Sequence, residues 1–146
     1  MYKRIVIGIA VLVLVFSTMG MVFAQDMPPQ VKAMVGAAKA AVKAVSADKV
    51  KAAIDAKEAV ILLDVRDGDE YAAGHLPGAI NLSRGTMEFK VFKAIPDQNA
   101  KIYVYCKTGA RSALATKTLI DLGYKNAILA DFQYADWVKA GYPVER

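Results

Sequence analysis

The sequence contains a single cysteine, Cys106, and a single histidine, His75. One cysteine excludes a disulfide bond within the chain, although paired cysteines readily oxidise in proteins that leave the cytoplasm. With 146 residues, 55% of them hydrophobic, the chain has material for one globular core and not for two. We therefore expect one folded domain with an appendage.

A large excess of either charge is also missing. The chain has 19 Lys and Arg residues against 14 Asp and Glu. Two of the 19 are Lys3 and Arg4, at the extreme N-terminus, so 17 basic residues face 14 acidic ones in the rest of the chain. A surplus this small does not indicate a protein that binds nucleic acid.

One long hydrophobic run is present. The chain begins MYKR and continues with uncharged apolar residues over positions 5–24, the layout of a secretory signal, and Val22-Phe23-Ala24 is suited to cleavage before Gln25. We predict a signal peptide over residues 1–24 and an exported, periplasmic protein. The alternative is a retained anchor facing the periplasm, because about 20 apolar residues can cross a bilayer; membrane contact would then occur only through this segment.

Residues 25–45 form the predicted N-terminal helical extension. Over residues 30–45, valine, methionine and alanine recur at helical spacing, and Lys32, Lys39 and Lys43 lie off that stripe. The helix is either a dock or membrane-surface element with a basic face, or it packs on the following domain or acts as a spacer. We favour the second interpretation.

The remainder, residues 46–146, alternates short apolar runs with helical patterns. Strands are predicted over residues 59–63, 79–82, 102–105 and 127–129, and helices over 47–56, 69–73, 87–94, 111–122 and 135–140. Alternation of this kind predicts an α/β domain in which helices flank both faces of a central parallel sheet.

Cys106 follows the strand 102–105 directly and precedes a helix, so it is placed at the carboxyl end of a sheet strand, where open α/β sheets bind ligands. The turn from strand to helix points backbone N–H groups inward and makes a nest for an anion. Lys107 and Arg111 should favour the thiolate, and Gly109 supplies backbone freedom. Alternatively, Lys107 is solvated and Arg111 forms a structural ion pair.

The length of this loop argues against a cysteine-dependent phosphatase, which needs five residues between its cysteine and an arginine that grips phosphate. Here four residues separate Cys106 from Arg111, and position 112 is Ser. A shorter loop suits one added sulfur atom better than a tetrahedral phosphate or arsenate.

Four ordered segments resemble the rhodanese family: residues 63–66 (LDVR), 70–81 (EYAAGHLPGAIN), 106–112 (CKTGARS) and 137–144 (WVKAGYPV). The resemblance extends over about residues 46–145 and implies a rhodanese α/β sandwich. It implies ping-pong sulfur transfer through a persulfide on Cys106, without a metal or a cofactor. It further implies a substrate-binding cradle made by the backbone of Lys107, Thr108, Gly109, Ala110 and Arg111.

The resemblance assigns Asp64, Arg66 and Glu70 to a charged cluster under the active loop, where an ion-pair network is as good an interpretation as a direct catalytic part. His75 lies in the turn GHLPG and is expected to be a hydrogen-bonded structural residue, not a general base. Arg84 either reaches the rim of the pocket or, as we favour, is a solvated loop arginine.

The sequence departs from the family at two places. Phe132-Gln133 stand where the family commonly has Gly-Gly before the tryptophan, and their bulk is expected to reshape one wall of the pocket or a partner surface. The loop, residues 106–111 (CKTGAR), is also not the Cys-Arg-Lys-Gly type associated with efficient thiosulfate use. This difference leaves open a physiological donor other than thiosulfate, including another protein's persulfide.

The leading hypothesis is an enzyme, a thiosulfate sulfurtransferase that passes sulfur from a small anionic donor to cyanide or a thiol. A second hypothesis is a persulfide carrier or sensor inside a protein complex, with the helix of residues 30–45 as its dock. A noncatalytic module is disfavoured because the cysteine and a complete loop are present.

Overall fold

The structure is a computed structural model that describes residues 27–146. The signal peptide or anchor predicted for residues 1–24 lies outside the described residues. Between residues 27 and 146, no helix is both long enough and apolar enough to cross a membrane.

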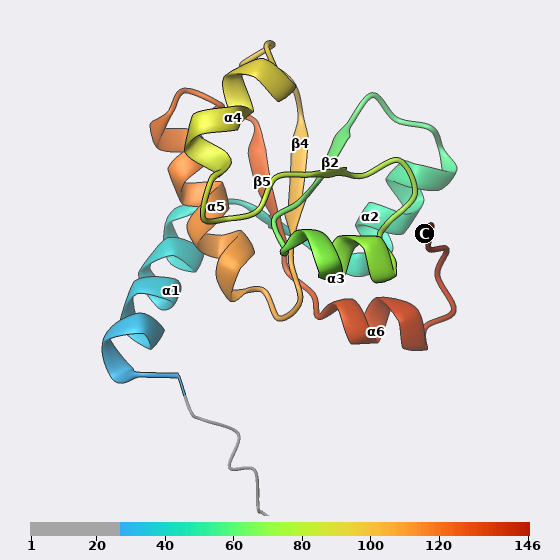
Figure 1. Cartoon of the computed structure of the whole chain (residues 1–146), viewed down its shortest axis with the longest axis horizontal. Helices are drawn as coiled ribbons and strands as arrows, with labels where there is room; N and C mark the ends of the chain where they lie inside the picture. Colours follow the sequence, from blue (N-terminus) through green and yellow to red (C-terminus); the bar gives the residue numbers. More distant parts are fainter. Residues whose placement is uncertain (1–26) are drawn as a thin grey trace, which may run out of the picture.

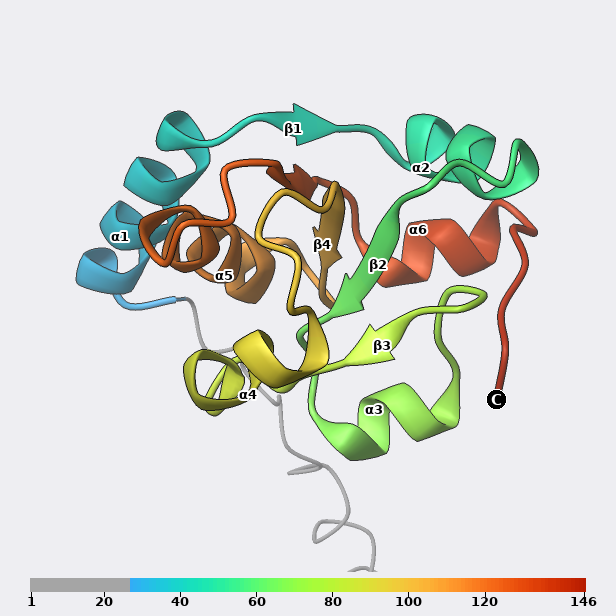
Figure 2. The ribbon, with the colours of Figure 1, turned by 90° about the horizontal axis from the view of Figure 1, so that it is seen from above.

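A five-stranded, fully parallel sheet forms the centre of the domain, with the strand order β1-β5-β4-β2-β3 (Figure 2). The strands are β1 (Ala44–Val45), β2 (Ile61–Asp64), β3 (Ile80–Asn81), β4 (Ile102–Tyr105) and β5 (Ala127–Ala130). The parallel sheet confirms the predicted α/β class.

Helices cover both faces of the sheet, as the sequence predicts (Figure 1). They are α1 (Pro29–Ala41), α2 (Ala47–Asp55), α3 (Gly68–Ala73), α4 (Met87–Ala94), α5 (Ala110–Asp121) and α6 (Tyr134–Lys139). Helices α1, α4 and α5 lie on one face and α2, α3 and α6 on the other (Figures 1 and 2). Parallel strands buried in this way read as continuous apolar runs.

The central strand β4 divides the core. Ile102 and Val104 pack with residues of α4 and α5 in one cluster, whereas Tyr103 and Tyr105 pack with residues of α2 and α6 in another. Successive side chains of a strand point to opposite faces, so the next residue, Cys106, belongs to the cluster beside α5.

Local signals set most of the element boundaries. Ser46 caps α2, its Oγ accepting the N–H of Lys49 at 3.3 Å. Helix α5 is followed by Gly123, which has a φ of 103°. The observed bounds of α4 and β4 are those predicted from the sequence.

The predicted helix over residues 30–45 is wrong at its C-terminal end. Helix α1 ends at Ala41, and Ala44 and Val45 form strand β1 beside Leu129 and Ala130 of β5. The N–H of Leu129 donates to the carbonyl of Lys43 at 2.9 Å. A helix running through residue 45 would leave this edge of β5 without backbone partners, which is costly for buried groups.

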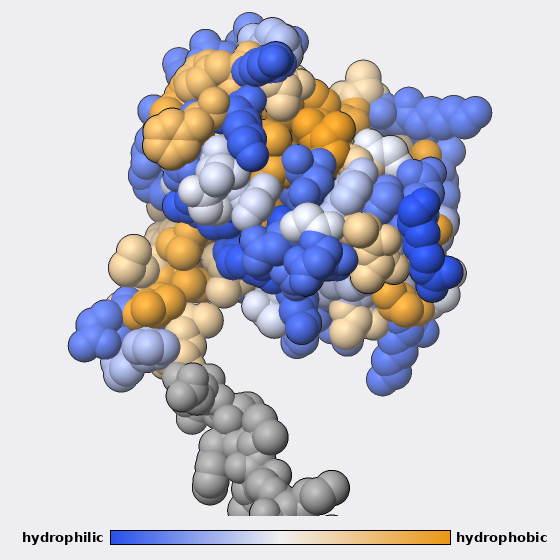
Figure 3. Space-filling view, in the orientation of Figure 1, coloured by the Kyte–Doolittle hydropathy of each residue, from blue (hydrophilic) through white to orange (hydrophobic). Residues whose placement is uncertain are grey.

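Helix α1 packs on the domain, the interpretation that we favoured. Its buried residues Val35 and Ala38 contact Ala113 of α5 and Leu129 of β5. Other apolar side chains stay at the surface: Figure 3 shows apolar patches over α4 and along α1. The exposed large hydrophobic residues of these helices are Phe89, Phe92, Val31 and Met34.

Candidate active site

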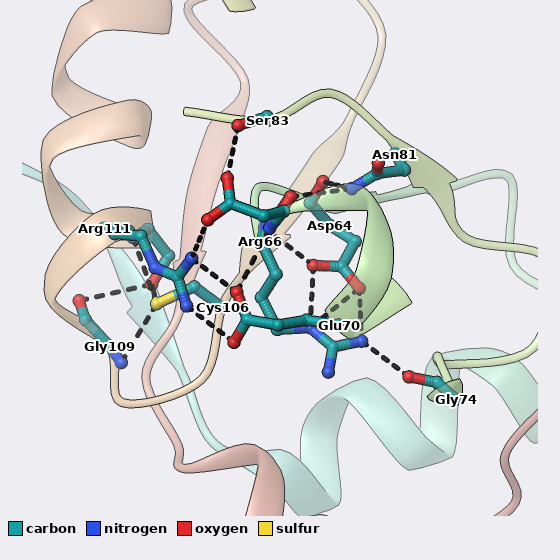
Figure 4. Close-up of polar contacts among 11 residues, drawn as sticks. Asp64, Arg66, Glu70, Gly74, Asn81, Ser83, Cys106, Gly109 and Arg111 are labelled. Carbon is teal, nitrogen blue, oxygen red and sulfur yellow. Dashed lines mark hydrogen bonds and ion pairs between the residues drawn. The ribbon is translucent and has the colours of Figure 1, made fainter. Parts of the chain in front are cut away.

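Cys106 lies where β4 ends and the chain turns into α5 (Figure 4). Its side chain is fully buried. Gly109, at the N-cap of α5, has a φ of 91°, a left-handed conformation that glycine adopts without steric cost. The turn therefore brings the backbone of Gly109 next to the sulfur of Cys106, three residues earlier in the chain.

Two backbone amides point at the sulfur. The N–H of Gly109 donates to Cys106 Sγ at 3.2 Å and that of Ser112 at 3.3 Å. Both belong to the first turn of α5, where backbone N–H groups have no helical partner and the helix dipole favours negative charge. A thiolate or a persulfide anion would be stabilised at this position.

Ser112 is a site residue that sequence reasoning missed. The thiol of Cys106 donates to Ser112 Oγ at 3.4 Å, and this hydroxyl donates to the carbonyl of Gly109 at 3.2 Å. The available signal was its position in the first turn of the predicted helix, directly after Arg111, where free N–H groups gather.

The other residues of the predicted cradle differ in their exposure and in the element to which they belong. Lys107 and Thr108 are exposed, and Ala110 begins α5. The carbonyl of Lys107 accepts the N–H of Tyr134 at 2.9 Å, which joins the loop to α6. The expected substrate contacts of these residues stay predictions.

Arg111 forms an ion pair at the base of the loop. Its Nη1 and Nη2 donate to Glu70 at 2.7 and 2.9 Å, and Nη1 lies 3.4 Å from Asp67 (Figure 4). The Arg111 hydrogen bonds lower the pKa of Glu70 to about 2, and the bond with Glu70 raises the pKa of Arg111 above its ordinary value. This is the alternative arrangement considered for Arg111.

Asp64 and Arg66 form a second, buried ion pair. Arg66 Nη2 lies 2.6 Å from Asp64 Oδ2 and 2.7 Å from the carbonyl of Gly74. The guanidinium also lies over the ring of Tyr134, 4.0 Å from its centroid. Burial opposes the charge, but hydrogen bonding to Asp64 overcomes it and holds the pKa of Arg66 above its ordinary value.

The charge of Arg66 also helps to lower the pKa of Glu70, so the Asp64–Arg66 and Arg111–Glu70 pairs influence each other through charge. The first pair connects the end of β2 to α6, and the second connects α3 to α5. The catalytic contribution of these pairs stays a prediction.

His75 is held as a structural residue. Its Nδ1 lies 3.0 Å from the carbonyl of Tyr71, and its ring stacks on that of Tyr71 with centroids 3.8 Å apart.

Arg84 is not the solvated arginine that we favoured. Its Nη1 donates to Glu88 at 2.7 Å and its Nη2 to Thr118 at 3.4 Å, because the start of α4 lies against α5.

Phe132 fills space between two aromatic residues of the core. Its ring centroid lies 6.2 Å from that of Tyr105 and 5.4 Å from that of Trp137. Gln133 is the N-cap residue of α6.

Among residues 27–146, no group of three or more metal-ligating side chains is placed to hold a metal ion.

A parallel sheet with one cysteine at the carboxyl end of its central strand, under the N-terminus of the following helix, is the arrangement of a rhodanese-like domain. The sequence pattern of that family, the rhodanese-like domain, matches residues 46–140, and the chain belongs to this family.

Two curated relatives cover different shares of the chain. YrkF of Bacillus subtilis strain 168 is 31% identical over 93 residues, which are 64% of this chain and 49% of YrkF. PspE of Escherichia coli K12, a thiosulfate sulfurtransferase, is 36% identical over 62 residues, which are 42% of this chain and 60% of PspE. The chain thus spans between about half and three fifths of the length of these relatives.

A solved structure resembles a larger part of the chain. The polysulfide-sulfur transferase homodimer of Wolinella succinogenes superposes with a TM-score of 0.68 and 33% identity, covering 80% of this chain and 87% of that one. Sulfur transfer is thus the chemistry named for relatives found by sequence and by structure.

Proposed function

We propose that the protein is a sulfurtransferase that takes a sulfane sulfur from a small anionic donor such as thiosulfate and delivers it to cyanide or a thiol. The observation that carries the proposal is the pair of N–H groups, from Gly109 and Ser112, that donate to Cys106 Sγ. They stabilise negative charge on this atom, which both a thiolate and a persulfide require.

The reaction proceeds in two half-reactions at one sulfur atom. The Cys106 thiolate attacks the outer sulfur of thiosulfate; the Sγ–S bond forms, the S–S bond of the donor breaks, and sulfite leaves with the electron pair. An acceptor thiolate or cyanide then attacks the outer sulfur of the persulfide, and the electron pair of the Sγ–S bond returns to Cys106. No net oxidation of the protein occurs over the cycle.

The identity of the donor is the finer part of the proposal. PspE is named for thiosulfate and the Wolinella protein for polysulfide, and both donors are anions with a terminal sulfane sulfur. The departure of the loop from the Cys-Arg-Lys-Gly type favours testing polysulfide beside thiosulfate. A protein-borne persulfide, as in the carrier hypothesis, is the third donor to compare.

The predicted N-terminal signal places this reaction outside the cytoplasmic membrane. The reacting partners would then be the sulfur anions and thiols of the periplasm. This location is part of the proposal and rests on the pattern of residues 1–24.

The intact mass of the protein before and after exposure to thiosulfate tests the proposal. Wild type should gain the mass of one sulfur atom. A reductant should remove this sulfur from one sample, and cyanide should remove it from another as thiocyanate appears. Cys106→Ser should gain nothing and serves as the matched control, because the chain has no other cysteine.

Other outcomes separate the alternatives. Gain of sulfur from polysulfide but not from thiosulfate would keep the proposed enzyme and change its donor. Gain of sulfur from a persulfidated protein alone would favour the carrier hypothesis. A thiol that alkylates but accepts sulfur from none of the three would contradict the proposed function.

A further inference from the structure

Helix α1 brings a lysine to the active loop from outside the segment that matches the family, residues 46–140. Lys39, in the last turn of α1, forms an ion pair with Asp131, and Nζ lies 2.5 Å from Oδ1. Asp131 follows β5 directly, at the carboxyl edge of the sheet that also carries Cys106. The pair is held in place by the packing of Val35 and Ala38 of α1 on α5 and β5.

The Lys39–Asp131 pair lies against the glycine that cradles the sulfur. A Cβ atom at Gly109 would lie 3.1 Å from Asp131 Oδ1 and 3.4 Å from Lys39 Nζ. The N–H of the same glycine donates to Cys106 Sγ at 3.2 Å. One residue therefore separates the ion pair from the reacting sulfur.

Carboxylates are numerous around this loop. Glu70 and Asp67 both pair with Arg111, so two negative charges share one guanidinium. Asp131 adds a third carboxylate on the other side of the loop, and Lys39 is its ion-pair partner. Without Lys39, an anion approaching the sulfur would meet an uncompensated negative charge beside Gly109.

The Lys39–Asp131 pair is placed to affect the electrostatic field around the loop more than the folding free energy of the domain. The side chains of Lys39 and Asp131 are 37% and 42% exposed, and ion pairs this open contribute little to folding free energy. The field of an uncompensated charge nevertheless reaches about 10 Å at ordinary ionic strength, which includes the whole loop.

We propose that Lys39 is a specificity-determining residue: it neutralises Asp131 beside Gly109 and so admits anionic sulfur donors to Cys106. Helix α1 is thereby a part of the donor site and not only a support for α5. The nature of the donor rests on the proposed function, whereas the charge filter is a property of the loop that can be measured without sulfur transfer.

Alkylation of Cys106 by two reagents of similar size measures the filter. Iodoacetate is an anion and iodoacetamide is neutral, so the ratio of their rates reports the charge beside the sulfur. Four proteins are compared with wild type by intact mass: Lys39→Met, Asp131→Asn, the double variant, and Lys32→Met, an exposed lysine of the same helix, as the control.

Lys39→Met should lower the ratio of iodoacetate to iodoacetamide rates about threefold, the effect of one unit charge several ångströms away in a largely aqueous environment. Asp131→Asn should raise it by a similar factor, and the double variant should restore the wild-type ratio. High salt should reduce all these differences, and Lys32→Met should leave the ratio unchanged. Equal changes in both rates, with an unaltered ratio in every variant, would show that the pair is only structural.

Thiosulfate kinetics provide the second measurement. Lys39→Met should raise KM for the dianion about tenfold with a smaller change in kcat, and Asp131→Asn in that background should reverse the effect. Loss of kcat alone would overturn the inference. If wild type accepts no sulfur but the alkylation ratios shift as described, the proposed function fails and the charge filter stands. If a persulfide forms but the ratios do not shift, the charge filter fails and the proposed function stands.

Discussion

Gly109 combines two requirements of the active loop in one residue. Its φ of 91° lets the chain reverse into α5, and its N–H donates to the sulfur of Cys106. A side chain at this position would be strained by the backbone conformation and would press on Asp131, 3.1 Å from the Cβ position. Geometry at the sulfur thus depends on the absence of a side chain.

Gly109→Ala should destabilise the fold by about 1–2 kcal/mol, the cost of a non-glycine residue in the left-handed region, and should lower the rate of persulfide formation at Cys106. Urea unfolding and intact mass measure the two effects. Gly36→Ala is the matched control: it lies inside α1 with nothing within 4 Å of its Cβ position, and alanine there should raise stability by about 0.5–1 kcal/mol. Equal stability of the two variants would contradict the strain at Gly109.

At the scale of elements, one carboxylate joins two helices. Glu70 is the third residue of α3, where its carboxylate accepts the N–H of Asp67 and completes a capping box. The same carboxylate receives both hydrogen bonds from Arg111 of α5. Short helix α3 is therefore fixed against the active loop by charge as well as by its cap.

This pair predicts a specific pH dependence. The pKa of Glu70 is about 2 in the folded protein against an ordinary value of 4.5, so its contribution to stability is complete above pH 4.5 and is lost as the pH falls toward 2. Glu70→Gln should lower the free energy of unfolding by on the order of 2 kcal/mol at pH 7, after allowance for solvent screening. The difference from wild type should vanish near pH 2.

Urea unfolding at a series of pH values measures this difference. Glu58→Gln is the control, because it removes a more exposed carboxylate that pairs with Lys101 at 3.1 Å, and it should change stability little at any pH. A Glu70→Gln deficit that persists unchanged at pH 2 would assign the effect to packing instead of charge.

At the scale of the whole molecule, the sheet separates two apolar clusters that share its strands. The chain's one tryptophan, Trp137, is buried on the face covered by α2 and α6. Leu119 of α5 is buried on the opposite face. Because β4 contributes side chains to both clusters, we expect the described domain to unfold as one cooperative unit.

Leu119→Ala should lower stability by about 3 kcal/mol through loss of buried apolar contacts and the cavity that remains. Trp137 fluorescence, which reports the far face, should shift to lower urea concentration together with the circular dichroism signal. Val138→Ala, at a site 49% exposed, should shift neither by more than about 0.5 kcal/mol. A tryptophan transition that stays at its wild-type midpoint would show that the two faces unfold separately.

The sequence alone determined the order of the elements after residue 46, the parallel sheet and the position of Cys106 after β4. These depend on local patterns: apolar runs for strands buried on both faces, helical periodicity, and caps such as Ser46. The strand-to-helix turn at residues 106–110 also follows from local pattern, since it needs only a strand, a glycine and a helix start. The direction of backbone N–H groups toward Cys106 could therefore be predicted.

The tertiary structure decided which side chains meet at the site. Arg111 faces Glu70, from an element about 40 residues earlier, Val45 joins the sheet beside β5, and Lys39 reaches Asp131 across a separation of 92 residues. The contacts of Lys39 and Val45 depend on the packing of α1 on α5 and β5, and that of Arg111 depends on the position of α3 beside α5. Local propensity carries no information about them, because it acts over a few residues whereas packing acts across the chain.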